Sequence, residues 1–302
     1  MSTLPDIVVG NPACHEALTV FPLFLNASTG VDYLLSDEAI SAGSVTVEEV
    51  SEGGSVPNLL VTNKGDSRVL FLEGEELRGA KQNRVLNTSV LIAAHSKTPI
   101  PVSCVEQGRW RYRTKHFVSE GSHSSSKLRR YLKASVSDSL KAGLGHSSDQ
   151  GAVWQEVSRQ MKTLGSSSST HAMADTYTAY APSLAEYKEH LKYVEGASGL
   201  AVAVGEKIVA LDVFDKPATC QKVWDRLLSG VVMDALEAED VRRQADRKDV
   251  EELLARLRAS SWTPAPAVGE GEEFRYDPGP EAYASALVCG GAVLHGSVVL
   301  AS

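Results

Sequence analysis

The stretch GLAVAVGEKIVALDVF, residues 199 to 214, decides the fold class of this chain. It consists of two apolar runs around Gly205-Glu206, and a glycine at the first central position is what a type II′ hairpin turn requires. A similar pair of runs, SALVCGGAVLHGSVVL at 285 to 300, is turned at Gly290-Gly291. Because a lone two-stranded hairpin is only marginally stable in water, these distant hairpins are expected to share a sheet or to stack face to face.

Further strands are predicted in the first hundred or so residues. Apolar and polar residues alternate over 56–61 and 68–73, and the turn-forming residues 63–66 between them predict a hairpin. Runs rich in Val, Ile, Thr and Ser predict two more strands at 84–92 and 99–106. Together these strands are expected to form an antiparallel meander.

Helices are expected after His116, where apolar residues recur at helical spacing. The predicted helices cover 126–142, 150–164, 183–194 and 217 to the mid-230s. The third is expected to begin at Ser183, because Glu186 three residues later completes a capping-box pattern. The charged segment 237–258 predicts a surface helix or helix pair, and the small polar residues SEGSHSSS at 119–126 predict a mobile loop.

The order of these elements predicts an α+β fold, in which antiparallel β-hairpins form a sheet or sandwich core. We expect one domain over 1–302 with a helical insertion at about 119–195 and C-terminal helices. The alternative is a β-rich domain at 1–118 followed by an α/β domain at 119–302, which the length and the Ser-rich breaks allow.

Composition restricts the class of protein. At 302 residues and 43% hydrophobic, the chain can bury a large core, and 38 acidic against 30 basic side chains give a net charge of −8, which disfavours nucleic acid and anionic membrane as partners. No apolar run of 18 residues and no signal-peptide pattern is present, and the four cysteines are scattered, so a cytoplasmic location is expected. Exposed hairpin edges favour a homodimer.

The densest polar constellation lies in LFLEGEELRGAKQNRVLN, residues 70–87, and in IPVSCVEQGRWRYR, residues 100–113. In a meander, Glu73, Glu75 and Glu106 are expected to come together as catalytic acid/base groups or as ligands of a divalent metal. Arginine side chains suit phosphate, and amides suit sugar hydroxyls or base edges. The predicted substrate-binding residues are Glu76, Arg78, Gln82, Asn83, Arg84, Arg109 and Arg111. An edge hairpin with a charged solvent face explains the same residues about equally well.

Other features are weaker signals. Cys104, flanked by valines, is expected to be a small core residue more than a nucleophile. The basic and aromatic residues of 109–113 alternate, so in a strand the arginines would share one face and the aromatics the other. His123 falls in the predicted loop and makes no ligand spacing with its neighbours. No GxSxG, HExxH, GxGxxG or P-loop pattern is present, and neither the metal nor any other cofactor can be named.

Two blocks of the chain resemble a known bacterial family. VLFLEGEELRGAKQNRVLNTSVLIAAHSKTPIPVSCVEQGRW (69–110) and GLAVAVGEKIVALDVFDKPATCQKVWDRLLSGVVMDAL (199–236) are similar to proteins named for association with ADP-ribosylglycohydrolases and rhodanese-phosphatases. The resemblance implies binding or processing of ADP-ribose, NAD or a related phosphorylated nucleotide. With the three carboxylates as base or metal ligands, hydrolysis of a phosphoester or glycosidic bond is the reaction that such a pocket would support. The alternative from the residues alone is a non-catalytic module that binds a partner or senses a ligand, through 237–258 or the Ser-rich loops.

Overall fold

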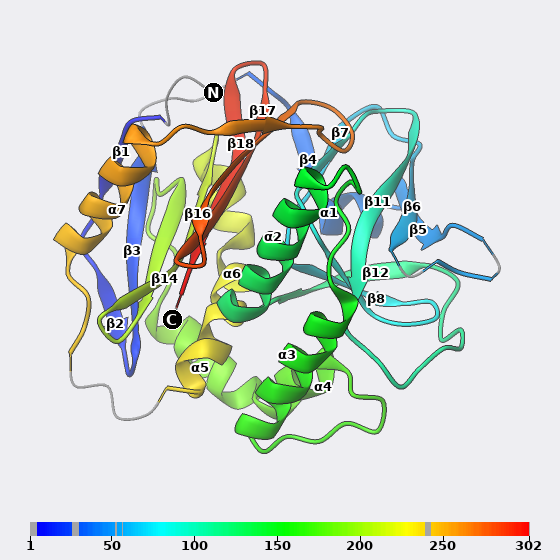
Figure 1. Cartoon of the computed structure of the whole chain (residues 1–302), viewed down its shortest axis with the longest axis horizontal. Helices are drawn as coiled ribbons and strands as arrows, with labels where there is room; N and C mark the ends of the chain where they lie inside the picture. Colours follow the sequence, from blue (N-terminus) through cyan, green and yellow to red (C-terminus); the bar gives the residue numbers. More distant parts are fainter. Residues whose placement is uncertain (1–4, 26–29, 52, 56, 239–242, 302) are drawn as a thin grey trace.

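The protein has an α+β structure of helices packed on largely antiparallel sheets (Figure 1). This architecture confirms the predicted fold class. The computed structural model describes residues 5–25, 30–51, 53–55, 57–238 and 243–301.

The larger sheet has nine strands in the order β1-β3-β13-β14-β18-β17-β16-β15, with β2 paired to β3. Its strands are β1 Ile7–Val9, β2 Ala13–His15, β3 Leu18–Leu25, β13 Gly199–Val204, β14 Lys207–Phe214, β15 Thr263–Ala265, β16 Glu272–Gly279, β17 Ala282–Cys289 and β18 Ala292–Leu300. Both C-terminal hairpins were predicted correctly, and β14 pairs with β18 to join them in one sheet. Gly205 has φ 61°, and Gly290 and Gly291 have φ 58° and 81°, so each tight turn uses a conformation that glycine adopts without strain.

The N-terminal strands form a six-stranded sheet, β12-β8-β9-β11-β6-β5, and a three-stranded sheet, β10-β7-β4. These elements are β4 Tyr33–Leu35, helix α1 Ser36–Ser41, β5 Val45–Glu49, β6 Asn58–Asn63, β7 Arg68–Phe71, β8 Glu75–Gly79, β9 Arg84–Leu86, β10 Val90–Ile92, β11 Ser96–Cys104 and β12 Phe117–His123. All their pairings are antiparallel except that of β4 with β7.

The predicted meander of this region is wrong. The hairpin expected between 56–61 and 68–73 does not form, because β6 pairs with β5 and β11, whereas β7 pairs with β4 and β10. The Asn63 amide donates hydrogen bonds to the carbonyls of Ser67 and Ala93, at 2.8 and 2.9 Å, and holds the chain where it passes from one sheet to the other. The strand predicted at 84–92 likewise divides into β9 and β10, which belong to different sheets.

The prediction of a mobile loop at 119–126 is also wrong, because most of this segment belongs to strand β12, which pairs with β8. Its small side chains serve close packing. A Cβ atom at Gly230 in helix α6 would lie 2.4 Å from the carbonyl oxygen of Ser124, so the helix and the end of β12 are in direct backbone contact. Ser124 and His123 are consequently buried. Serine and glycine indicate tight packing here instead of mobility.

The remaining helices are α2 Ser126–Lys141, α3 Gln150–Thr163, α4 Met173–Ala179, α5 Ala181–His190, α6 Pro217–Leu236 and α7 Arg247–Ala259. The predictions of α2, α3 and α6 are confirmed within a few residues. Helix α5 begins two residues before Ser183, with Tyr180 as its N-cap and no side-chain cap, so the capping-box prediction is wrong, and α4 was not predicted. Within 237–258, α7 begins only at Arg247, and residues 239–242 lie outside the described residues.

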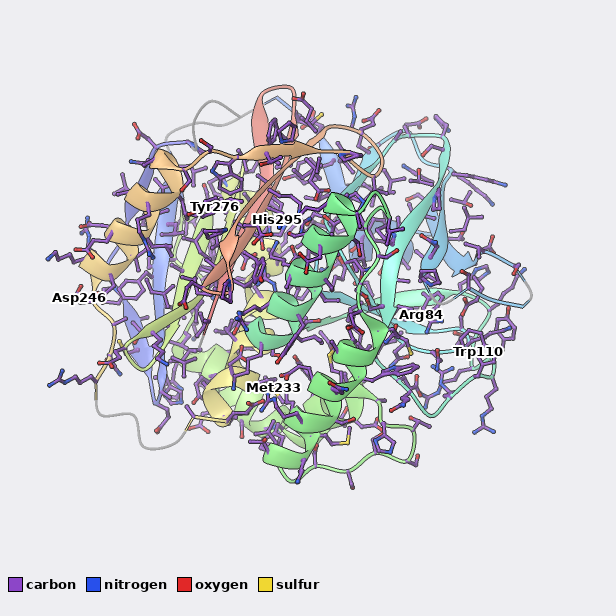
Figure 2. All side chains as sticks on the ribbon, in the orientation of Figure 1. Arg84, Trp110, Met233, Asp246, Tyr276 and His295 are labelled. Carbon is purple, nitrogen blue, oxygen red and sulfur yellow. The ribbon has the colours of Figure 1, made fainter. Side chains whose placement is uncertain are left out.

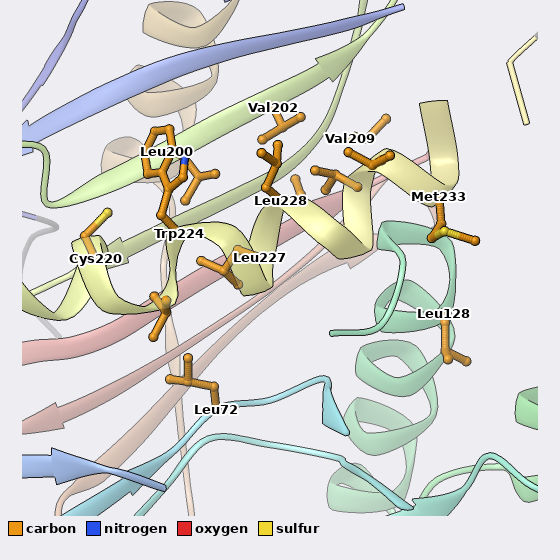
Figure 3. Packing of buried hydrophobic residues seen from close by; sticks show 14 of the residues in the cluster. Leu72, Leu128, Leu200, Val202, Val209, Cys220, Trp224, Leu227, Leu228 and Met233 are labelled. Atoms are coloured by element: carbon orange, nitrogen blue, oxygen red, sulfur yellow. The ribbon is translucent and has the colours of Figure 1, made fainter. Parts of the chain in front are cut away.

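Helix α6 lies between the nine-stranded sheet and the N-terminal strands (Figure 3). Its Trp224 and Leu228 pack toward Leu200 and Val202 of the sheet, and Leu72 approaches from the other side. The helix thus forms the centre of the largest hydrophobic cluster. No helix in the described part of the chain is long and apolar enough to cross a membrane.

Candidate functional site

Glu73 lies in a buried cluster of charges beneath α2. With 1% of its surface exposed, its carboxylate is paired with Lys133, and its Oε1 lies 3.4 Å from Arg129 Nε. Burial alone would raise the pKa of Glu73, but Lys133 and Arg129 hold that pKa below its usual range. Burial lowers the pKa of Lys133 to about 8.

The same cluster extends into the nine-stranded sheet. Arg129 donates to both oxygens of Asp212, at 2.9 and 2.6 Å, and His295 Nε2 lies 3.0 Å from Asp212 Oδ1. The second ring nitrogen of His295 is 2.7 Å from Ser89 Oγ. All of these side chains are buried, so we interpret the cluster as the polar contact that fixes α2 to the sheet.

Glu75 lies in a polar environment separate from that of Glu73. Its carboxylate accepts from Ser36 and, at 2.6 Å, from Ser119 Oγ, and it lies 3.2 Å from Arg226 Nη1. Glu73 and Glu75 were expected on one face, but Gly74 between them has φ 78° and directs the two side chains apart. The three predicted catalytic carboxylates therefore lie in three separate environments.

Glu106 lines a surface groove of about 930 Å³ that holds much of the predicted site. Of the predicted residues, the groove is lined by Arg78, Asn83, Glu106, Arg109 and Arg111. Its opposite wall is formed by residues 169–178, which are tied across by the hydrogen bonds from Gly108 N to Thr170 O (2.8 Å) and from Met173 N to Val105 O (2.9 Å).

Arg109 and Glu106 form the rigid floor of this groove. Two guanidinium nitrogens of Arg109 donate to the two Glu106 oxygens at 2.8 and 2.6 Å, and Thr170 Oγ1 and Asn83 N donate to the same carboxylate. Burial would raise the pKa of Glu106, yet these donors, Arg109 first, hold that pKa below its usual range. Glu106 is therefore an ionised anchor more than a free base.

Segment 109–113 is irregular, so the predicted alternating strand is wrong. Arg109 turns inward, donating to the carbonyls of Ala80 (2.6 Å) and Arg111 (3.0 Å), and Arg113 N donates to Ala80 O at 2.9 Å. These bonds leave the side chains of Arg111 and Arg113 exposed. The groove thus presents two arginines on a backbone that is held in place.

Arg78 adds a third guanidinium to the groove. It is positioned by Glu76, whose Oε2 lies 2.9 Å from Arg78 Nε. Glu76 is fully buried, and burial raises its pKa despite this pairing. The carboxylate beneath Arg78 thus holds the arginine side chain at the groove wall.

Gln82 and Arg84 lie behind the groove. Gln82 Nε2 donates to the Glu106 carbonyl at 2.9 Å and its Oε1 accepts from Arg84 Nη1 at 3.0 Å. Arg84 is fully buried, and its guanidinium carbon lies 5.7 Å from the centroid of the Trp110 ring. Neither Gln82 nor Arg84 is among the residues that line the groove. Cys104 is fully buried beside them, as expected for a core residue, and burial raises the pKa of its thiol.

Sequence reasoning missed the second wall of the groove, which includes Ser169, Thr170, Asp175 and Thr178. These residues come from the Ser-rich break and the unpredicted helix α4, and no local pattern relates them to Glu106. It also missed the buried cluster, although a signal was present: Arg129 and Lys133 follow Leu128 and Leu132 at the same four-residue spacing, which places charge beside the apolar stripe of α2.

A metal centre is not formed by the side chains that the structure describes, since no group of three or more His, Cys, Asp or Glu residues among them could hold an ion. The model of one protein family matches residues 6–299, and its description is ARG and Rhodanese-Phosphatase-superfamily-associated Protein domain. No curated protein and no solved structure matches the chain.

Proposed function

The chain belongs to the family of ARG and Rhodanese-Phosphatase-superfamily-associated proteins, and we propose that it binds a phosphorylated nucleotide of the ADP-ribose or NAD class. The binding site in this proposal is the arginine-lined groove. The observation that carries the proposal is the convergence of Arg78, Arg111 and Arg113 on one hollow of about 930 Å³. Arginine binds phosphate oxygens in bidentate fashion, and a hollow of this size suits a small-molecule ligand.

Local charge supports the proposal against the acidic character of the whole chain. Arg109 is neutralised by Glu106, and Arg78 is paired with Glu76, whereas Arg111 and Arg113 are exposed at the rim. The main chain of this segment is held at Arg111 O and Arg113 N, so a phosphate that enters the groove meets two exposed arginines on a backbone that needs no further ordering.

Binding is better supported than hydrolysis. A carboxylate that acts as a general base must be free to take a proton near neutral pH. Glu106 has both oxygens engaged by Arg109, and its pKa is lowered, so it is a weak base. The exposed carboxylate in the groove is that of Asp175 on the opposite wall, and we propose it as the base if the ligand is hydrolysed.

The alternative of a partner-binding module is less well supported. The apolar stripe of α7, including Leu253 and Leu257, is buried in the fold. Its exposed charges pair along the helix, as Arg247 with Glu251 at 2.7 Å.

Isothermal titration with ADP-ribose tests the proposal, with Arg111→Ala as the groove variant and Arg256→Ala, an exposed arginine of α7, as the matched control. A lost charge-assisted hydrogen bond is worth about 1.5–3 kcal/mol, so Arg111→Ala should weaken binding by roughly ten- to a hundredfold, and Arg256→Ala should not weaken it. Absence of binding of ADP-ribose, NAD and AMP to the wild-type protein at about 1 mM, a threshold of roughly −4 kcal/mol, would overturn the proposal. Turnover of ADP-ribose by the wild-type protein would establish hydrolysis, and its loss in Asp175→Asn would assign the base to Asp175.

A further inference from the structure

A second hollow, of about 860 Å³, lies on the other side of residues 112–114. Tyr112, Arg113 and Thr114 line both hollows, so this short segment forms the boundary between them. The far wall of the second hollow comes from the end of β5 and the residues after it, including Glu48, Glu49 and Ser51. A ligand longer than a phosphate group can therefore cross the 112–114 segment and occupy both hollows.

Two aromatic side chains are exposed at this boundary. Trp110 is 48% and Tyr112 52% exposed, and Figure 2 shows Trp110 at the outer edge of the molecule. Lys81 Nζ lies between them, 5.2 Å from the Trp110 ring centroid and 5.1 Å from that of Tyr112. This cation holds the rings in place while leaving half of the Tyr112 surface open. Exposed aromatic rings that are fixed in this way are platforms on which a nucleobase can stack.

The far wall is acidic, in contrast to the arginine groove. Glu49 Oε1 accepts from Lys81 N at 3.4 Å and lies 3.9 Å from Arg84 Nη2, whereas its buried Oε2 has no hydrogen-bond partner within the described residues. A buried carboxylate oxygen without a donor is costly, and a hydroxyl donor would relieve that cost. Carboxylates accept hydrogen bonds from ribose hydroxyls in this way.

We infer that the second hollow is the nucleoside subsite, in which Tyr112 stacks on the base and the Glu48–Glu49 wall faces the ribose hydroxyls. Arg113, which borders both hollows, then lies at the phosphate between the two ends of the ligand. This inference rests on the proposed function and deepens it, because it makes Tyr112 the residue that distinguishes a nucleotide from a base-free sugar phosphate.

The test compares AMP with ribose 5-phosphate, which differ only in the adenine base, by equilibrium titration. Tyr112→Ala should weaken AMP binding about tenfold or more and leave ribose 5-phosphate unchanged, whereas Tyr112→Phe should retain AMP. Ser51→Trp, which fills part of the second hollow alone, should weaken AMP selectively. Arg111→Ala should weaken both ligands, because Arg111 lines only the first groove.

The outcomes separate the inference from the function that it assumes. If AMP and ribose 5-phosphate bind the wild-type protein equally well, or if Ser51→Trp and Tyr112→Ala leave AMP unchanged, the nucleoside subsite is wrong and the phosphate groove stands. If neither ligand binds the wild-type protein while ADP-ribose does, the nucleoside subsite is wrong; if ADP-ribose and NAD do not bind either, the proposed function fails and the inference fails with it. Because Ser51 and Tyr112 are exposed, circular dichroism should show an unchanged fold in these variants.

Discussion

Gly230→Ala should destabilise the protein, although alanine is ordinarily the better helix former. Gly230 lies in α6 where the helix touches the end of β12. An added Cβ would lie 2.4 Å from the carbonyl oxygen of Ser124 and 3.0 Å from that of His123. Both neighbours are backbone atoms, so no side-chain rotation can relieve the contact.

The magnitude follows from that geometry. Ordinary contact begins at 3.4 Å, so α6 and β12 must separate by 3.4 − 2.4 = 1.0 Å. Overpacking of a dense core costs typically 1–3 kcal/mol, and the rigid backbone neighbours place this case at about 3. Alanine in a helix regains about 1 kcal/mol over glycine. The expected net loss is about 2 kcal/mol.

Urea unfolding followed by circular dichroism measures this loss. The matched control is Gly151→Ala in α3, where the nearest atom to the new Cβ is a side-chain oxygen, Asp149 Oδ1 at 3.2 Å, and not a backbone atom. That variant should be unchanged or up to about 1 kcal/mol more stable. A Gly230→Ala protein as stable as Gly151→Ala would refute the direct backbone contact between α6 and β12.

Four further predictions concern buried ionisable side chains. Glu73→Gln should lower the free energy of unfolding, measured with urea, by about 3–5 kcal/mol, because Lys133 is left without its counter-ion. The control Glu251→Gln, in an exposed ion pair, should lower it by less than about 1 kcal/mol. Equal losses would contradict the role of the buried cluster. Burial lowers the pKa of His123 from 6.5 to about 3, so its stabilising contribution is complete above pH 6.5 and is lost as the pH falls. At pH 5 the loss is about 2 kcal/mol, and His123→Gln should remove it. Burial raises the pKa of Asp234 from 3.8 to about 6, which stabilises the fold as the pH falls from 6 to 4, so Asp234→Asn should steepen the acid loss of stability. Arg109→Lys should speed amide hydrogen exchange over 110–115 and weaken nucleotide binding, because an ammonium group cannot replace the bidentate contact with Glu106. Unchanged exchange would show that Arg109 does not hold this segment.

Local signals predicted the elements that local chemistry determines. The hairpins at 199–214 and 285–300 combine apolar runs with glycine turns, and α2, α3 and α6 carry helical spacing, so these elements could be predicted without knowledge of their partners. The order of the strands in the sheets could not be predicted in this way. Strand β6 pairs with strands before and after it in the chain, whereas β7, which directly follows β6, does not pair with it.

The candidate site was predictable only in part for the same reason. The arginines of 78–111 were identified by type and density, and much of that set lines the groove. Gly74, with φ 78°, changes the direction of the chain and separates Glu73 from Glu75, which a regular strand would align. The wall at 169–178 reaches Glu106 only through long-range contacts, which leave no trace in local sequence.

The cluster beneath α2 imposes a rule on how this sequence can change. Glu73 and Asp212 contribute two negative charges, and Arg129 and Lys133 contribute two positive ones, so the four side chains sum to zero. Any single neutral replacement leaves a net charge in the core. In related chains these four positions should therefore vary in compensating pairs or stay fixed, and the covariation of residue 73 with residue 133 should be stronger than that of any exposed ion pair.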